Sequence, residues 1–165
     1  MIVRPGQPAD AAAIAAIYNE GIADRLATFE TEPRRPEDVL GWLGEGAPPL
    51  IVAESGGEVI GWARAGEYSD RCVYAGIGEY AVYVARAARG NGVGRRLLDA
   101  LTEATERRGY HKLVSRIFPE NEASLALARA CGFREVGVHR NHGKLDGAWK
   151  DTVVVERLLG EAARG

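Results

Sequence analysis

The sequence predicts a mixed β-sheet flanked by helices. Three observations lead to this fold class: a hairpin signal in the first half, a strand, glycine loop, helix and strand in succession, and two closing strands. A tight turn pairs strands antiparallel, whereas a strand that returns through a helix pairs in parallel. The chain of 165 residues is 46% hydrophobic, which suffices for one domain spanning residues 1–165.

The first half alternates strands with helices. We expect a first strand at residues 2–4 and then a helix from about Pro8, because apolar residues recur there every three or four positions. Residues 26–36 show no period and are expected to be irregular, and a second short helix follows them. Residues 50–53 and 59–63 flank Ser-Gly-Gly-Glu, a turn sequence that predicts an antiparallel hairpin.

The second half contains the crossover. Residues 78–84 are expected to form a strand, and a glycine loop then leads into a helix that ends at Gly109. Trp149, near the start of the last strand, is expected to be a core residue, with a subunit contact as the alternative. The remaining elements are expected to be a strand at 113–117, a helix at 121–131, and strands at about 133–139 and 149–158.

Composition argues against several classes of protein. Lys and Arg number 21 against 23 Asp and Glu, whereas a nucleic-acid binder is normally basic, so we expect no nucleic-acid partner. Cys72 and Cys131 form no C-x-x-C pair, which favours free thiols in the cytoplasm. No signal peptide or run of about 20 apolar residues occurs, so no membrane association is expected. His139 and His142 are expected on opposite strand faces, which disfavours a metal site.

A glycine-rich loop predicts a phosphate-binding site. The run Arg89-Gly90-Asn91-Gly92-Val93-Gly94 lies where a helix begins, and there main-chain N–H groups lack partners and the helix dipole favours an anion. The loop lacks the Gly-Lys-Ser/Thr of a P-loop, and Arg95 stands where a dinucleotide fingerprint requires Gly. The alternative, in which the glycines serve only to turn the chain, does not account for the whole Arg-x-x-Gly-x-Gly pattern.

This loop resembles the pyrophosphate loop of the GNAT N-acetyltransferase superfamily, whose pattern is Gln/Arg-x-x-Gly-x-Gly/Ala. The resemblance covers nearly the whole chain and includes the strand at 82–84 and the segment from Asn121 to the Gly132-Phe133 pair. It implies a mixed, mostly antiparallel sheet of about six to seven strands with about four helices. It also implies acetyl-CoA as co-substrate, no metal, and a homodimer.

The resemblance also indicates which residues bind acetyl-CoA. Val82 and Val84 would pair with the pantetheine arm as an added strand, and the loop would cradle the pyrophosphate. Asn121 would bond the cofactor with Ser124 nearby, although Asn121 is also a good helix N-cap. The expected set is Val82, Tyr83, Val84, Arg89, Gly90, Asn91, Gly92, Val93, Gly94, Arg95, Asn121 and Ser124.

Further segments are similar to the phosphinothricin, arsinothricin and methionine sulfoximine acetyltransferase group. They are Tyr18-Asn19, Thr28-Phe29-Glu30, the strand at 82–84 and residues 143–151. This similarity implies acetyl transfer to the α-amino group of a small amino acid. Two alternatives stay open: a protein N-terminal or lysine acetyltransferase, and a sensor that binds acyl-CoA without chemistry.

Glu79 is the expected catalytic residue. An ammonium has no lone pair, so the acceptor amine must lose a proton before it attacks the thioester. Glu79 matches the acidic residue of the group and shares a strand face with Tyr83, although it could be an ordinary charged residue near a strand end. Many GNAT enzymes use a Tyr as general acid where this chain has Ala128, so thiolate departure would rely on water.

The acceptor site is expected to comprise Phe29, Glu30, Arg71 and Tyr74. Arg71 matches an arginine that contacts the substrate's acidic group in this family, and a guanidinium suits such bidentate contacts. Ser69 stands where some relatives carry a second arginine. A solvated loop charge at Arg71 and core roles for the aromatic residues are the alternatives.

Overall fold

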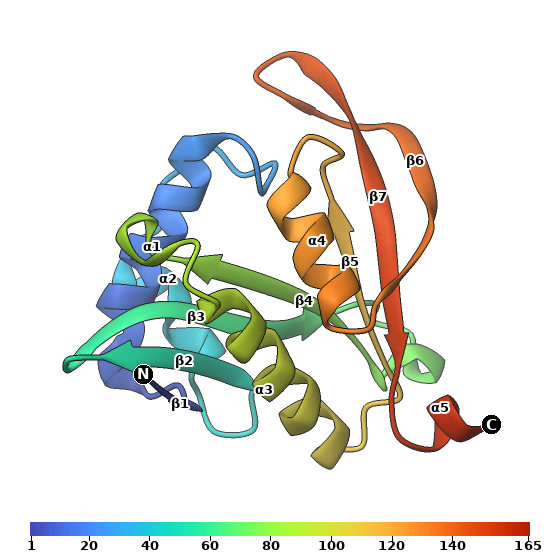
Figure 1. Cartoon of the computed structure of the whole chain (residues 1–165), viewed down its shortest axis with the longest axis horizontal. Coiled ribbons are helices and arrows are strands. Elements are labelled where there is room, and N and C mark those ends of the chain that lie inside the picture. Colours follow the sequence, from blue (N-terminus) through green and yellow to red (C-terminus); the bar gives the residue numbers. More distant parts are fainter.

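The computed structural model describes residues 1–165 as a seven-stranded sheet in the order β1-β2-β3-β4-β5-β7-β6, flanked by helices (Figure 1). The strands are β1 Ile2–Pro5, β2 Leu50–Ser55, β3 Glu58–Glu67, β4 Ile77–Val84, β5 Lys112–Ile117, β6 Arg134–Leu145 and β7 Ala148–Leu158. The helices are α1 Ala11–Asp24, α2 Pro36–Val39, α3 Val93–Arg107, α4 Glu122–Ala130 and α5 Glu161–Arg164. Short 3₁₀ turns lie at Pro8–Asp10, Leu40–Trp42, Cys72–Tyr74 and Arg86–Ala88.

The strand pairing confirms the mixed, mostly antiparallel sheet. The expected hairpin is formed by β2 and β3, and only β4 and β5, which the α3 crossover connects, pair in parallel. The parallel pairing is short and ends where Glu79 lies opposite Val114. Beyond it, the Ser115 hydroxyl donates to the carbonyl of Tyr80 at 3.1 Å. From Ala81 onward, one edge of β4 has no neighbouring strand, so the sheet opens at its centre.

Two hydrophobic cores lie on opposite faces of the sheet. Because side chains alternate along a strand, Ile51 packs beneath α3 and α4, whereas its neighbour Val52 packs against α1 and α2. The apolar stripe of α3 supplies Leu97, Leu98 and Leu101, all fully buried. Each such leucine stabilises the fold by roughly 1.5–3 kcal/mol relative to exposure. The first core spans both halves of the sheet, from Ile51 to Val155, whereas the second lies only under the N-terminal strands.

Two expectations about the C-terminal hairpin are wrong. β6 continues past residue 139, and a register shift between His139 and Gly143 interrupts the two-residue alternation of side chains. The rings of His139 and His142 therefore stack with centroids 4.4 Å apart instead of facing opposite ways. Trp149 is 57% exposed, so it is not a core residue, and the Nζ of Lys144 lies 4.7 Å from its ring centroid.

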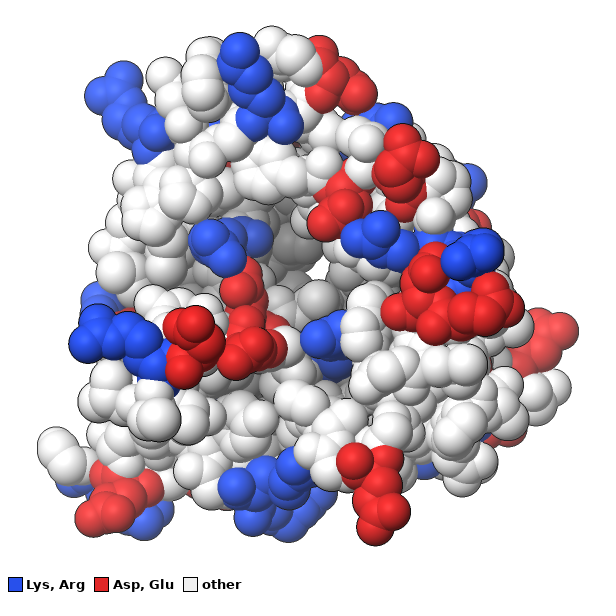
Figure 2. Space-filling model, turned by 180° about the vertical axis from the view of Figure 1, so that it is seen from behind, with Lys and Arg blue, Asp and Glu red and all other residues white.

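Surface charge, helix hydropathy, the cysteines and the metal-ligating side chains bear on the expectations from composition. Acidic and basic side chains are interspersed on the face shown in Figure 2, which is hollowed near its centre. No helix is both long enough and apolar enough to cross a membrane. Cys72 and Cys131 are both free thiols, and no group of three or more His, Cys, Asp or Glu side chains is placed to hold a metal ion.

Candidate active site

Two clefts meet at the opening between β4 and β5. A cavity of about 710 Å³ lies on the α1 side of the sheet, and a groove of about 460 Å³ runs between β4, α4 and the start of α3. Both clefts are lined by Val82, Tyr83, Asn121 and Ser124, so they are continuous past the free edge of β4. A ligand lying in the groove could therefore present one end to the cavity.

The glycine loop forms one end of the groove. Gly90 (φ 81°) and Gly92 (φ 78°) adopt left-handed conformations, which glycine reaches at little cost. The backbone N–H groups of residues 90–95 donate to no acceptor in the chain, and no side chain caps the start of α3. Unpaired N–H groups at a helix N-terminus bind phosphate well, so the loop fits the pyrophosphate of acetyl-CoA.

The structure brings nearly all the expected cofactor residues together. Those that line the groove are Val82, Tyr83, Val84, Arg89, Gly90, Gly92, Val93, Gly94, Arg95, Asn121 and Ser124. Asn91 is the exception, because its amide donates to the carbonyls of Ala88 at 3.2 Å and Arg89 at 3.3 Å and so braces the loop from within.

Asn121 has the helix-capping role that the sequence left open. Its Oδ1 accepts from the backbone N–H of Ser124 at 3.1 Å, and its Nδ2 donates to the carbonyl of Leu26 at 3.3 Å. The residue is buried. One side chain therefore caps α4 and also ties it to the irregular segment that follows α1.

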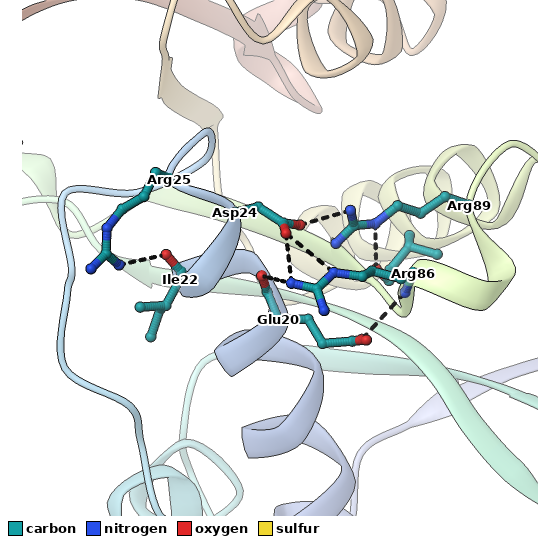
Figure 3. Close-up of polar contacts among 7 residues, drawn as sticks. Glu20, Ile22, Asp24, Arg25, Arg86 and Arg89 are labelled. Atoms are coloured by element: carbon teal, nitrogen blue, oxygen red, sulfur yellow. Dashed lines mark hydrogen bonds and ion pairs between the residues drawn. The ribbon is translucent and has the colours of Figure 1, made fainter.

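A carboxylate that sequence analysis missed anchors the glycine loop to α1 (Figure 3). Asp24 accepts hydrogen bonds from Arg86 Nη2 at 2.6 Å, Arg86 Nε at 3.1 Å and Arg89 Nη1 at 2.8 Å. Arg89 Nε also donates to the carbonyl of Val84 at 3.0 Å. Arg86 first, and then Arg89, holds the pKa of Asp24 below its usual range. The sequence does contain one indication of this contact. An acidic residue at a helix C-terminus interacts unfavourably with the helix dipole, so basic partners are expected near it.

Aromatic rings form the floor of the cavity. Tyr83 stacks on Trp62 with centroids 5.0 Å apart, and Tyr18 packs against Tyr83 at 4.9 Å. Trp42 lies 5.5 Å from Trp62 and lines the same wall. Burial raises the pKa of Tyr83 well above its usual value, so its phenol stays protonated and remains a hydrogen-bond donor at neutral pH.

The segment after α1 and the β6–β7 hairpin close the cavity from the other side. Phe29 meets Phe118 edge to face with centroids 4.9 Å apart. A Cβ at Gly143 would come within 2.9 Å of the Phe29 ring, so glycine there permits the contact. Arg25 and Asp146 bridge the two segments at 2.9 Å. Phe29 and Glu30 line the cavity, as the resemblance implies.

Glu79 also lines the cavity, and its carboxylate is paired with Arg116. Oε1 accepts from Arg116 Nε at 3.1 Å and Nη2 at 2.9 Å, and Oε2 accepts from Nη2 at 3.0 Å. Arg116 Nη1 lies 3.4 Å from His142 Nε2. The sequence alone does not predict Arg116 at this site, and it singles out His142 only as a disfavoured metal ligand. Because β5 also contains Lys112 and Ser115, a charged residue at 116 is no signal by itself.

Two expected acceptor residues do not line this cavity. Arg71 and Tyr74 lie in the exposed loop before β4, where the Arg71 guanidinium is 5.6 Å from the Tyr74 ring centroid. Their role in acceptor binding stays a prediction. Ala128, at the position of the general-acid Tyr of many GNAT enzymes, has no acidic group to offer the leaving thiolate, and its side chain packs in the core with 1% exposure.

Comparisons with known proteins agree with this geometry. Residues 14–133 match the model of the acetyltransferase (GNAT) family. The chain is 35% identical to a phosphinothricin N-acetyltransferase from Streptomyces coelicolor, with 95% of each chain covered. It is 32% identical to an L-methionine sulfoximine/L-methionine sulfone acetyltransferase from Pseudomonas paraeruginosa, covering 95% of this chain and 94% of the relative.

A solved structure with acetyl-CoA bound shares the fold. It is a GNAT superfamily phosphinothricin acetyltransferase from Sinorhizobium meliloti, 30% identical to this chain. The superposition covers 99% of this chain and 91% of the other, with a TM-score of 0.91.

Proposed function

The chain belongs to the acetyltransferase (GNAT) family, and we propose that it moves the acetyl group of acetyl-CoA directly onto the α-amino group of a small amino acid. Phosphinothricin, arsinothricin, methionine sulfoximine and methionine sulfone are the candidate acceptors. The observation that carries this proposal is the meeting of a phosphate-binding groove and a carboxylate-bearing cavity at the free edge of β4. The whole chain acts as one catalytic unit.

Acetyl-CoA is proposed to lie in the groove. The N–H groups of residues 90–95 bind its pyrophosphate, and the free edge at Val82 and Val84 pairs with the amide groups of the pantetheine arm. Strand-like pairing fixes the direction of the arm. The thioester then reaches the cavity past Tyr83, which lines both clefts.

The reaction follows from where the groups lie. The amine nitrogen attacks the thioester carbonyl carbon, and the carbonyl π electrons move to oxygen as the new C–N bond forms. Glu79 takes the ammonium proton before the attack, directly or through one water, and the nitrogen gives up its second proton to water as the amide forms. The C–S bond then breaks as the carbonyl re-forms, and CoA leaves as a thiolate that is protonated by water. The α-ammonium of a peptide has a pKa of about 8, and the neighbouring carboxylate of a free amino acid raises that pKa, so the acceptor arrives largely as an ammonium ion and Glu79 has a proton to remove.

The cavity favours a small acceptor over a protein one. Phe29, Phe118 and the β6–β7 hairpin narrow it from one side, whereas a protein acetyltransferase needs a long groove for an extended peptide. The aromatic floor, together with charged side chains such as Glu30, Arg64 and Glu79 in the lining, suits a small polar acceptor such as an amino acid.

We also propose that the protein forms a homodimer through the β6 edge. β6 is an exposed edge strand along most of its length, and Val136, Val138 and Trp149 are large exposed hydrophobic residues on the β6–β7 hairpin. β6 is long and otherwise mostly polar, so these exposed apolar side chains mark the part of the edge that a partner would cover. A two-fold partner would cover it.

The experiment measures CoA release from acetyl-CoA across phosphinothricin, methionine sulfoximine, methionine sulfone, ordinary amino acids and N-terminal peptides. Glu79→Gln should lower kcat by about 10²-fold or more with the Kd of acetyl-CoA unchanged. Glu103→Gln on the exposed side of α3 is the matched control and should behave as wild type.

The outcomes separate the parts of the proposal. Unchanged turnover by Glu79→Gln would show that Glu79 is not the base. Selective turnover of a peptide would favour the protein acetyltransferase. No turnover with any acceptor, despite tight acetyl-CoA binding, would overturn the proposed function in favour of a sensor.

A further inference from the structure

The acceptor cavity contains an arginine whose charge no group in the chain balances. Arg64 lies on β3 opposite Ala81 of β4, and its guanidinium carbon is 4.1 Å from the centroid of the Trp42 ring. Its side chain makes no hydrogen bond and no ion pair within the chain, although it is partly buried. Burial lowers the pKa of Arg64, but a guanidinium still remains charged at neutral pH.

An unpaired cation in this position is unfavourable without a ligand. Withdrawing a charge from water costs free energy unless an anion or hydrogen-bond acceptors replace the lost hydration. Stacking on Trp42 offsets part of that cost and holds the guanidinium plane, while its N–H edge remains free to donate. An arginine held in this way is ready to bind a planar carboxylate through two parallel hydrogen bonds.

The backbone makes room for the guanidinium beside the proposed base. A Cβ at Gly66 would come within 3.2 Å of Arg64 Nη2 and within 3.5 Å of the carbonyl of Glu79. Gly66 is the direct strand partner of Glu79. The Arg64 side chain therefore extends along β3 toward the position opposite Glu79, and both residues line the same cavity from adjacent strands.

The acidic residues that line the cavity do not neutralise Arg64. Glu79 is held by Arg116 at 2.9 Å, and Glu30 is held by Arg34 at 3.0 Å. Glu67 makes no ion pair. A negatively charged ligand would supply the anion that the chain does not place against Arg64.

We propose that Arg64 binds the carboxylate of the acceptor, and that it thereby restricts the enzyme to amines that carry a carboxylate on the same carbon. This inference rests on the proposed function, because it assigns the acceptor's acidic group within the same site. An α-amino acid has its amine and its carboxylate on one carbon, which matches a cation beside a base. Arg64 is a specificity-determining residue in this scheme.

The test compares two acceptors that differ only in the carboxylate: L-methionine sulfone and its carboxamide. Wild type should prefer the acid in kcat/KM by about 10²-fold or more, since an unpaired buried charge penalises the neutral analogue. Arg64→Met keeps side-chain length without charge and should reduce that preference to a few-fold, with little change for the carboxamide. Arg64→Lys should restore part of it. Arg107→Met, an exposed arginine on α3, is the matched control.

Two further measurements separate this inference from a merely structural role and from the proposed function. Arg64→Met should not lower the Tm of the free protein, because an unpaired charge is removed; a fall of several degrees would make Arg64 structural and overturn the inference. The second measurement is the binding of each acceptor to the CoA-loaded protein, monitored through the fluorescence of Trp42 and its neighbours. This measurement does not depend on turnover.

Each outcome then has one meaning. Turnover without preference for the acid, or a preference that Arg64→Met retains, overturns the role of Arg64 and leaves the proposed function standing. If no amino acid is turned over, the proposed function fails, and the binding measurement decides: a preference for the acid that requires Arg64 supports the inference, and equal binding overturns it.

Discussion

Replacing Asp24 by Asn tests the anchor between α1 and the glycine loop. The substitution removes two ion pairs, at 2.6 Å to Arg86 and 2.8 Å to Arg89. The Asp24 side chain is 27% exposed but its partners are 51% and 45% exposed, so each pair is worth only about 1 kcal/mol after solvent screening. The substitution also removes the unfavourable interaction of a negative charge with the C-terminal end of the helix dipole, which stabilises the folded protein by about 0.3–1 kcal/mol.

The net loss should therefore be about 1–1.5 kcal/mol. For a chain of this size that corresponds to a fall in Tm of about 3–5 °C, measured by circular dichroism at pH 7 and low salt. Asp146→Asn is the matched control, since Asp146 also pairs with an arginine, at 2.9 Å, but is 59% exposed. Its Tm should change by about 1 °C or less.

The contribution of Asp24 to stability should decrease as the pH falls. The pKa of Asp24 is lowered in the folded protein, so its contribution is complete above the ordinary carboxyl pKa of about 4 and is lost as the pH falls through the lower folded value. Asn does not titrate, so the Tm gap between wild type and Asp24→Asn should narrow below pH 4. A gap at pH 7 no larger than that of Asp146→Asn, or one that persists in acid, would refute the anchor.

Two further predictions concern the loop and the subunit contact. Gly92→Ala should cost about 1 kcal/mol and weaken acetyl-CoA binding several-fold by calorimetry, because φ is 78° although no atom lies within 4 Å of the added Cβ. Gly41→Ala, equally open but without positive φ, is the control, and equal Kd values for the two variants would contradict the role of the left-handed loop. Val138→Asp should convert the proposed dimer to monomers in sedimentation, whereas Glu103→Gln should not; a wild type that sediments as a monomer would remove the dimer proposal.

Features set by nearby residues were predictable from the sequence. The hairpin, the crossover, the cap at Asn121 and the glycine loop each depend on turn chemistry or on periodicity within about 15 residues. The phosphate end of the groove followed from the loop and the helix it starts, whereas the rest of the groove lining was expected only from the resemblance. The resemblance added Glu79, Phe29 and Glu30, which all line the cavity.

The tertiary structure alone decided which charges are paired and which remain free. Asp24 meets Arg86 across 62 positions of sequence, and Glu79 meets Arg116 across 37. Arg64 stays unpaired, whereas Glu30 and Glu79 pair with other arginines, an outcome that no local pattern contains. The bulge that stacks His139 on His142 likewise breaks the alternation on which sequence reasoning relies. Local preferences determine backbone elements, whereas electrostatic partnership depends on distances that exist only after the sheet has formed.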